Sequence, residues 1–249
     1  MEIVISRDVK EMGKEAGIKA GRAIRYAISE QGIANIILAT GTSQFETLNQ
    51  LIAEEDIDWS KVVMFHLDEY IGLPISHPAS FRKYLKERFL AKAPPLKAAF
   101  LIDGENDATL ECERLSKLIS KHPIDVALVG IGENGHLAFN DPPADFEIET
   151  PYIIVDLDDQ CVQQQFGEGW FPSINDVPRK AISMSVKQIM KSKHIVCSVP
   201  DARKALAVKN SVENPVSNLY PASILQTHQH CTIFLDTSSA SLLTPGIIA

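Results

Sequence analysis

The chain has 249 residues and a mass of 27.5 kDa, which is enough for one large domain or two small ones with a buried core. Hydrophobic residues make up 45% of it and charged residues 22%, so an intrinsically disordered chain is excluded. Because 32 acidic residues outnumber 24 Lys and Arg, the net charge is -8, and no broad positive field attracts nucleic acids or anionic membranes. A small anionic substrate is compatible with this charge, since a few local donors can bind one phosphate.

The cysteines and the hydropathy pattern indicate where the protein works. Cys112, Cys161, Cys197 and Cys231 form no close-spaced pairs, so we expect buried free thiols in a reducing compartment. No apolar stretch approaches the roughly 20 residues that span a bilayer, and the first eight residues are typical of a strand rather than a signal peptide. The expected location is the cytoplasm, with neither nucleic acid nor membrane as a partner.

Short runs of β-branched residues alternate along the chain with longer segments that have helical spacing. The predicted strands are Glu2–Ser6, Asn35–Ala39, Val62–Leu67, Ala98–Leu101, Asp125–Val129, Tyr152–Val155, His194–Val199 and Cys231–Leu235. Apolar residues spaced three and four apart predict helices over residues 9–27 and 110–119. This alternation predicts an α/β fold of Rossmann-like type: a single doubly wound, mostly parallel sheet with helices on both faces.

No internal repeat or long linker divides the sequence, so residues 1–249 are predicted to form one domain. One segment breaks the alternation. Residues 156–178 are polar, carry three consecutive glutamines at 163–165 and include Gly-Glu-Gly-Trp. We expect a long functional loop there.

Ligands of an open parallel sheet bind outside the carboxyl ends of its strands, so the residues that follow each predicted strand are the candidates for a site. After Asn35–Ala39 comes a turn of small and hydroxyl-bearing residues, and a helix is expected to begin near Phe45. The turn consists of Thr40, Gly41, Thr42 and Ser43. Its N–H groups and hydroxyls could bind a phosphate, although an ordinary helix N-cap would use the same residue types.

Two adjacent carboxylates, Asp68 and Glu69, follow the apolar strand Val62–Leu67. Because neighbours on a strand point to opposite sides, only one of them should face a ligand. A partly desolvated carboxylate suits proton abstraction from carbon, since burial raises its pKa towards the working pH. The alternative is a solvated pair that caps the next turn.

A glycine-rich segment, Gly130-Ile131-Gly132-Glu133-Asn134-Gly135-His136, follows the strand at 125–129. Its glycines allow a sharp turn and a close approach to a ligand, and His136 could transfer a proton near neutral pH with Asp141 to orient it. The pattern is not the complete G-x-G-x-x-G of a dinucleotide loop. A structural hydrogen bond or half a metal site would explain the same pair, but no further His or Cys stands at ligand spacing, so no metal is predicted.

Lys204 follows the strand at 194–199, in the expected first turn of a helix. A lone helical lysine is usually a solvated surface charge, but this one comes at a fourth strand end. Hydroxyls with amides, a carboxylate, a histidine with an acid, and an ammonium therefore converge on one edge of the predicted sheet. That set fits acid–base chemistry on a small phosphate ester.

At these positions the sequence resembles the glucosamine-6-phosphate deaminase/isomerase family, which shares its fold with the 6-phosphogluconolactonases. The matching segments, in the family's order, are ATGTS (39–43), LDEYIGLP (67–74), HPASF (77–81), GIGENGHLAFNDP (130–142), FPSINDVPRKAISMSV (171–186), RKALAVK (203–209) and ASILQTH (222–228). Lactonases carry Asp-Glu-Arg where this chain has Asp68-Glu69-Tyr70, and they lack the Phe-Asn-acid-Pro run. The deaminase branch is therefore favoured.

The resemblance implies an enzyme that converts a 2-amino-2-deoxyhexose 6-phosphate, glucosamine 6-phosphate first, into fructose 6-phosphate and ammonia, without a cofactor. It implies that Asp68 moves the C2 proton to C1. It also implies that His136, with Asn134 and Asp141 beside it, opens the sugar ring. The phosphate would be held by Thr40, Gly41, Thr42, Ser43 and Lys204.

The chain departs from the family pattern at four positions. Asp141 stands where glutamate is usual, and being one methylene shorter it would reach His136 less well or leave more room for a substrate. Gly169 stands where an arginine usually helps to hold phosphate, Gln44 replaces a common proline, and Pro143 replaces a common glycine. These differences bear on the exact substrate more than on the reaction.

Three other functions stay open from the sequence. They are deamination of the epimer galactosamine 6-phosphate, hydrolysis of a sugar-phosphate lactone by the same histidine, and non-catalytic sensing of a sugar phosphate. A homo-oligomer and a monomer are both compatible with the sequence.

Overall fold

A computed structural model describes residues 1–246 of the chain. Its main sheet has seven strands in the order β1-β10-β9-β6-β2-β3-β5, and every neighbouring pair is parallel. The strands are β1 (Glu2–Ser6), β2 (Ala34–Leu38), β3 (Val62–His66), β5 (Ala98–Phe100), β6 (Val126–Val129), β9 (His194–Val199) and β10 (Cys231–Asp236). The predicted α/β class is confirmed, and seven of the predicted strands form this sheet.

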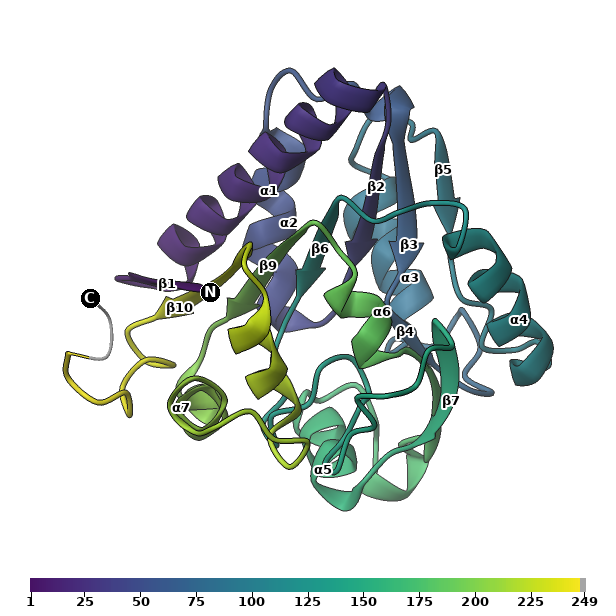
Figure 1. Ribbon diagram of the computed structural model, residues 1–249. Coiled ribbons are helices and arrows are strands. Elements are labelled where there is room, and N and C mark those ends of the chain that lie inside the picture. The colour runs from purple at the N-terminus through teal and green to yellow at the C-terminus, as the bar shows by residue number, and fades with distance from the viewer. Residues whose placement is uncertain (247–249) are drawn as a thin grey trace.

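Helices cover both faces of the main sheet, as Figure 1 shows. They are α1 (Val9–Gln31), α2 (Phe45–Ala53), α3 (Phe81–Leu85), α4 (Ala108–Ile119), α6 (Val186–Met190) and α7 (Ala205–Glu213). A seventh helix, α5 (Asp159–Gly167), lies outside these two layers and packs with Tyr70 and Ala181. Alternate strand residues serve the two faces: Ile36 and Leu38 pack with α1 and α2, whereas Ile37 packs with the layer that contains α4 and α7. All five positions of β2 and of β3 are buried for this reason.

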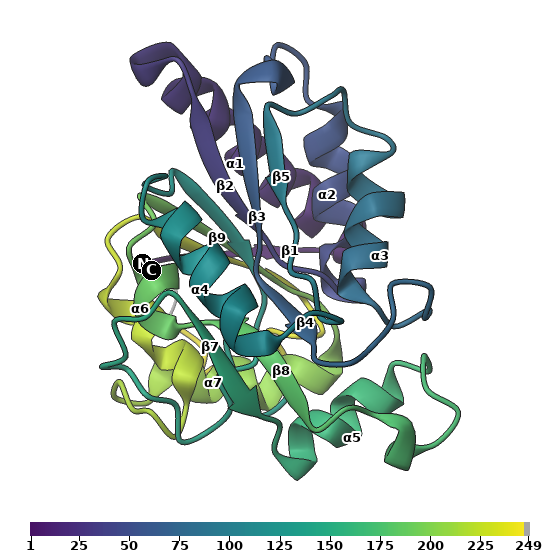
Figure 2. The same ribbon diagram turned by 90° about the vertical axis from the view of Figure 1, so that its right-hand side faces the viewer.

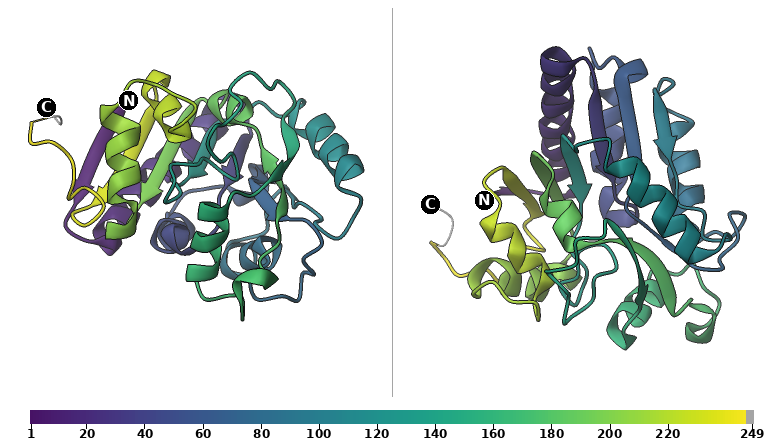
Figure 3. Two further views of the ribbon diagram at one scale, coloured as in Figure 1. Left: turned by 90° about the horizontal axis from the view of Figure 1, so that it is seen from below. Right: turned by 45° about the vertical axis from the view of Figure 1, so that its right-hand side comes forward.

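A second, three-stranded antiparallel sheet, in the order β4-β8-β7, lies beyond the carboxyl end of β3 (Figures 2 and 3). It consists of β4 (Asp68–Tyr70), β8 (Lys180–Met184) and β7 (Tyr152–Asp156). The strand predicted at 152–155 is therefore present, but it belongs to this sheet rather than to the main one. Asp68 pairs with Ser183, and the Met184 N–H donates to the carbonyl of Leu67, so β8 fixes the chain just where β3 ends.

The expected long loop over residues 156–178 is wrong in part, because α5 and a short 3₁₀ turn (Ile174–Asp176) lie inside it. The Asp158 carboxylate caps α5 by accepting from the N–H of Cys161. Helix α5 buries two glutamines beside one cysteine and one valine, so its buried face lacks the apolar stripe that periodicity detects.

All four cysteines are buried and unpaired, which confirms that part of the sequence prediction. Among residues 1–246, no helix combines the length and the apolar character needed to cross a membrane.

Candidate active site

The carboxyl ends of four neighbouring strands, β9, β6, β2 and β3, open into one cavity of about 260 Å3. Seven predicted site residues line it: Thr40, Gly41, Thr42, Ser43, Asp68, His136 and Lys204. The other two, Asn134 and Asp141, lie behind His136 and hydrogen-bond to it. The structure thus brings all nine together, while their roles in a reaction stay predictions.

Asp68 is the first residue of β4 and has its carboxyl group in the cavity wall, while Glu69 points to the opposite side. Asp68 is only 7% exposed, and none of the hydrogen bonds formed by residues 1–246 reaches its carboxyl oxygens. Burial, with a smaller contribution from the charge of Glu69, raises the pKa of Asp68 to about 8. Near neutral pH this group can therefore both hold and release a proton.

The imidazole ring of His136 packs against Gly132 in the glycine-rich segment at residues 130–135. A Cβ added to Gly132 would overlap the imidazole ring, so only glycine leaves room for the ring in this position. The φ of Gly135 is 87°, a left-handed value that favours glycine and turns the chain just before the histidine. His136 Nδ1 lies 2.9 Å from an oxygen of Asp141, which leaves Nε2 as the ring nitrogen available to a ligand.

The shorter side chain of Asp141 reaches His136 fully, contrary to one of the two expected consequences of its length. The same oxygen accepts from Nδ2 of Asn134 at 2.9 Å, and the second oxygen accepts from the N–H of Asp158 at 3.0 Å. Burial raises the pKa of Asp141, but the hydrogen bonds from His136, Asn134 and Asp158 outweigh it and leave that pKa below its ordinary value. Asp141 is therefore an anion that fixes the tautomer of His136 with the proton on Nδ1.

One group of possible metal ligands occurs among the described residues. His136, Asp141 and Cys161 each offer a ligand atom, and the three atoms lie within 4.8 Å of one another. A cation there would have to replace the hydrogen bond between His136 and Asp141. These residues are the ones that could hold a soft metal ion, and the sequence did not indicate Cys161 as a third ligand because it lies twenty residues from Asp141.

The turn after β2 combines a left-handed glycine with the start of two helical segments. Gly41 has a φ of 92°, the 3₁₀ turn Thr42–Gln44 follows it, and α2 begins at Phe45 as predicted. Buried Gln44 anchors the turn, since its Nε2 donates to the carbonyl of Val129 at 3.2 Å. The first N–H groups of such a turn have no partner within it and could bind an anion in the cavity that residues 40–43 line.

Lys204 ends a 3₁₀ turn (Ala202–Lys204) directly before α7, so it lies just ahead of the helix in which it was predicted. Its side chain is buried, and burial lowers the pKa of Lys204 although Glu133 and Glu168 oppose that shift. Arg203 is more exposed and pairs with Asp201 at 3.0 Å. This end of the cavity thus carries two cations and also carboxylates.

The cavity is also lined by several residues that the sequence analysis did not indicate as site residues. They are Phe81, Glu133, Phe139, Gln164, Gln165, Glu168, Asp201 and Arg203, together with smaller neighbours. The unusual composition of residues 156–178 was the available signal for Gln164, Gln165 and Glu168. Their placement depends on how α5 packs, which no local pattern shows.

Two residues of the cavity wall other than glycine have left-handed backbone conformations. Ala138 has a φ of 52° and Asp201 a φ of 86°. Such conformations cost on the order of 1–3 kcal/mol and persist only where the surrounding structure enforces them. Strain at these two positions is consistent with a functional site.

Comparison with known proteins identifies the family. Residues 7–234 match the family model of glucosamine-6-phosphate isomerases/6-phosphogluconolactonase. The chain belongs to this family. It is 34% identical to the glucosamine-6-phosphate deaminase of Lactobacillus delbrueckii subsp. bulgaricus, over 98% of this chain and 100% of the relative. It is 37% identical to the glucosamine-6-phosphate deaminase of Oenococcus oeni, over 92% of this chain and 95% of that relative.

Solved structures agree with this assignment. A monomeric glucosamine-6-phosphate deaminase superposes with a TM-score of 0.87 at 31% identity, over 97% of this chain and 100% of that one. A structure described as a putative 6-phosphogluconolactonase from Neisseria gonorrhoeae has a TM-score of 0.71 at 21% identity, over 95% of this chain and 99% of that one, and supports the fold alone. The protein is therefore an enzyme of this family.

Replacing Gly132 with alanine should displace the imidazole of His136, because the added methyl group occupies the position of the ring. We expect the Nδ1 proton that His136 shares with Asp141 to disappear from its downfield position in the NMR spectrum. Gly167→Ala is the matched control, since nothing lies within 4 Å of a Cβ added there. An unchanged Nδ1 proton in Gly132→Ala would show that the loop does not hold the ring.

Replacing Asp68 with asparagine should stabilise the protein at alkaline pH. With a pKa of about 8 when folded and an ordinary value of 3.8, the carboxyl group binds more protons in the folded state between these limits, so its ionisation destabilises the fold as pH rises through them. The free energy of unfolding of Asp68→Asn minus that of the parent should therefore be larger at pH 8.5 than at pH 5, by at least about 1 kcal/mol. Urea titrations at both pH values measure it, and a pH-independent difference would contradict the burial of this group.

Proposed function

We propose that the enzyme is an isomerising deaminase that converts glucosamine 6-phosphate and water into fructose 6-phosphate and ammonia. The observation that carries this proposal is the placement of the Asp68 carboxyl group and the His136 imidazole in one cavity with the turn at residues 40–43. The names of the relatives at 34% and 37% identity support the same substrate. We also propose that the two sheets form one domain, because β4 follows β3 after a single residue.

The phosphate would bind at the turn after β2. Its N–H groups and the hydroxyls of Thr40, Thr42 and Ser43 offer neutral donors, and the ammonium of Lys204 offers a buried charge. The family's usual arginine is absent at Gly169, which is exposed and does not line the cavity. Arg203 lines the same cavity and would supply the second cation in its place.

Ring opening would be the task of His136. The anionic Asp141 keeps the proton on Nδ1, so Nε2 can accept the proton of the sugar's anomeric hydroxyl and return it to the ring oxygen. Asn134 holds Asp141 and also accepts from the His136 N–H at 3.1 Å, so the imidazole has little freedom to turn. The open chain then presents an aldehyde at C1, which acidifies the proton at C2.

Asp68 would carry out the isomerisation. Its ionised carboxylate takes the C2 proton, the electron pair of that C–H bond forms the C1–C2 double bond, and the π electrons of the C1 carbonyl move to O1. O1 takes a proton from the C2 ammonium group, which gives a neutral enolamine, and the carboxyl group of Asp68 then protonates C1. The product is an iminium ion at C2. Water adds to it, the C2–N bond breaks, ammonia leaves, and the ketone of fructose 6-phosphate forms. No step in this scheme requires a cofactor.

A panel of substrates tests this proposal. Glucosamine 6-phosphate should yield equal amounts of ammonia and fructose 6-phosphate, and Asp68→Asn should lower kcat at least about 100-fold because the base is lost. Galactosamine 6-phosphate and 6-phosphogluconolactone are the comparison substrates. Faster deamination of galactosamine 6-phosphate would mean that the epimer is the substrate. Acid release from the lactone alone would indicate a lactonase, and binding without turnover would indicate a sensor. Full turnover by Asp68→Asn would remove Asp68 as the base.

The pH dependence of turnover should report the ionisation of Asp68. Only the carboxylate form can take the C2 proton, and burial raises its pKa to about 8, so kcat/KM should rise with pH and level off near or above that value. Initial rates between pH 5.5 and 9.5 at low substrate concentration give the profile. A rate that levels off near pH 5 would mean that the catalytic base has an ordinary carboxyl pKa.

A further inference from the structure

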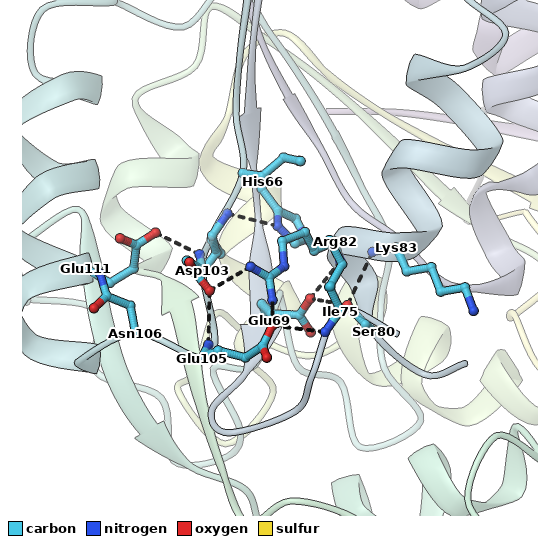
Figure 4. A network of polar contacts seen from close by, with 12 residues as sticks. His66, Glu69, Ile75, Ser80, Arg82, Lys83, Asp103, Glu105, Asn106 and Glu111 are labelled. Atoms are coloured by element: carbon cyan, nitrogen blue, oxygen red, sulfur yellow. Dashed lines mark hydrogen bonds and ion pairs between the residues drawn. The ribbon is translucent and has the colours of Figure 1, made fainter. Parts of the chain in front are cut away.

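Glu69 is completely buried next to Asp68, yet it does not line the cavity. Its carboxylate points towards Ser80 and Arg82 at the start of α3, as Figure 4 shows. One carboxylate oxygen accepts from the N–H groups of Tyr70 at 2.9 Å and Phe81 at 3.2 Å. The other accepts from the Ser80 hydroxyl at 2.9 Å and the Arg82 N–H at 2.6 Å.

This arrangement favours the ionised form of Glu69. Three of its four partners are backbone N–H groups, which can only donate, and only the Ser80 hydroxyl could turn to accept a proton from the carboxyl group. Burial raises the pKa of Glu69 above its ordinary value, although the four hydrogen bonds oppose that shift. When it is ionised, Glu69 spreads its charge over three backbone N–H groups and one hydroxyl.

The guanidinium group of Arg82 is not the counter-ion of Glu69. It pairs with Asp103 at 2.6 Å and with Glu105 at 2.5 Å, on the side of α3 towards the loop that follows β5 (Figure 4). Glu69 is thus joined to the start of α3 through the Ser80 hydroxyl and the backbone N–H groups of Phe81 and Arg82. The loop after β5 is joined to the same helix through the Arg82 side chain.

Phe81 connects this cluster to the cavity. Its N–H binds Glu69, and its ring lines the cavity together with Asp68. The ring stacks on Phe139 with centroids 5.7 Å apart, and Phe139 follows the His136 loop. A shift of α3 relative to β4 would therefore move one wall of the cavity with respect to both Asp68 and His136.

We propose that Glu69 is a positioning residue for the reaction. Its carboxylate locks the start of α3 to β4, so that Asp68 and the Phe81 wall keep a fixed geometry around the substrate. This inference rests on the proposed function, because it assigns Glu69 to the reaction in which Asp68 is the base. Glu69 also places a like charge one residue away from Asp68.

The negative charge of Glu69 raises the pKa of Asp68, so removing that charge should change the pH dependence of turnover. A purely structural role of Glu69 would not have this effect. Titratable groups surround Asp68 on several elements: Glu69 and Tyr70 lie on its own strand, Tyr152 on β7 and Cys161 in α5. The cavity wall adds His136, Glu133, Glu168, Asp201, Arg203 and Lys204. Of these, only Glu69 is changed by Glu69→Gln. Loss of its negative charge should move the acid limb of the kcat/KM profile downwards, by roughly 1 pH unit.

Two substitutions separate the charge from the hydrogen bonds. Glu69→Gln removes the charge and turns one acceptor into a donor, so kcat should fall at least tenfold and the acid limb should shift to lower pH. Glu69→Asp keeps the charge but withdraws it from α3, so kcat should fall while the acid limb stays in place. If either variant fails to fold, Ser80→Ala, which removes one of the four donors, should lower kcat several-fold with KM changed less than about twofold.

Asp125→Asn is the matched control. Asp125 is also a buried carboxylate, and it accepts from the Asn35 N–H at 2.8 Å, but it lies at the amino end of β6, away from the cavity. The Asp125→Asn variant should be less stable than the parent, whereas the pH profile of its kcat/KM should match that of the parent. Parent-like kcat and acid limb in the Glu69 variants and in Ser80→Ala, with an active parent, would overturn the role of Glu69 alone. A parent that deaminates no hexosamine 6-phosphate would overturn the proposed function and this inference with it.

Discussion

The site depends on one constraint: the Asp68 carboxyl group is held at the end of a fully buried strand, where no ion pair or hydrogen bond from residues 1–246 reaches it. All five residues of β3 are buried, and the chain reaches Asp68 only after that strand has passed between two helical layers. Burying an ionised carboxylate away from water and without such partners costs free energy. The protonated form costs less to bury, and this difference raises the pKa of Asp68. The small antiparallel sheet and α3 keep it there.

The second acid of the site shows the opposite behaviour. Asp141 is also largely buried, yet donors from His136, Asn134 and Asp158 surround it, and its pKa is lowered. Two carboxyl groups of the same type thus differ in their pKa: Asp68 accepts no hydrogen bond from residues 1–246 and its pKa is raised, whereas Asp141 has three donors and its pKa is lowered. Such a separation of pKa values within one site is typical of acid–base enzymes.

Much of this arrangement could be predicted from the sequence, because it depends on local patterns. Apolar runs predicted the strands of the main sheet, and the rule that ligands bind at carboxyl ends selected Asp68, His136 and the turn at 40–43. The short strands β4 and β8 were missed. Three residues of β4 follow β3 after one residue, and the pairing of β4 with β8 joins segments more than a hundred residues apart.

Other parts of the site depend on tertiary packing and carry no local signal. Helix α5 lacks an apolar stripe because glutamines occupy its buried face, and Glu168 enters the cavity only through the placement of that helix. The reach of Asp141 to His136 depends on the fold of the loop between them rather than on side-chain length. Glu69, which the sequence presents as the twin of Asp68, has a different role because a single residue step reverses the direction of its side chain.

The most direct test of this account is a carbon-13 NMR titration of the Asp68 side-chain carboxyl carbon in the intact protein, with the resonance assigned by its loss in Asp68→Asn. The account predicts a titration midpoint several units above the ordinary aspartate value, close to 8. A midpoint near 4 would show that water reaches this carboxyl group freely, and the assignment of Asp68 as the proton carrier would then have no physical basis.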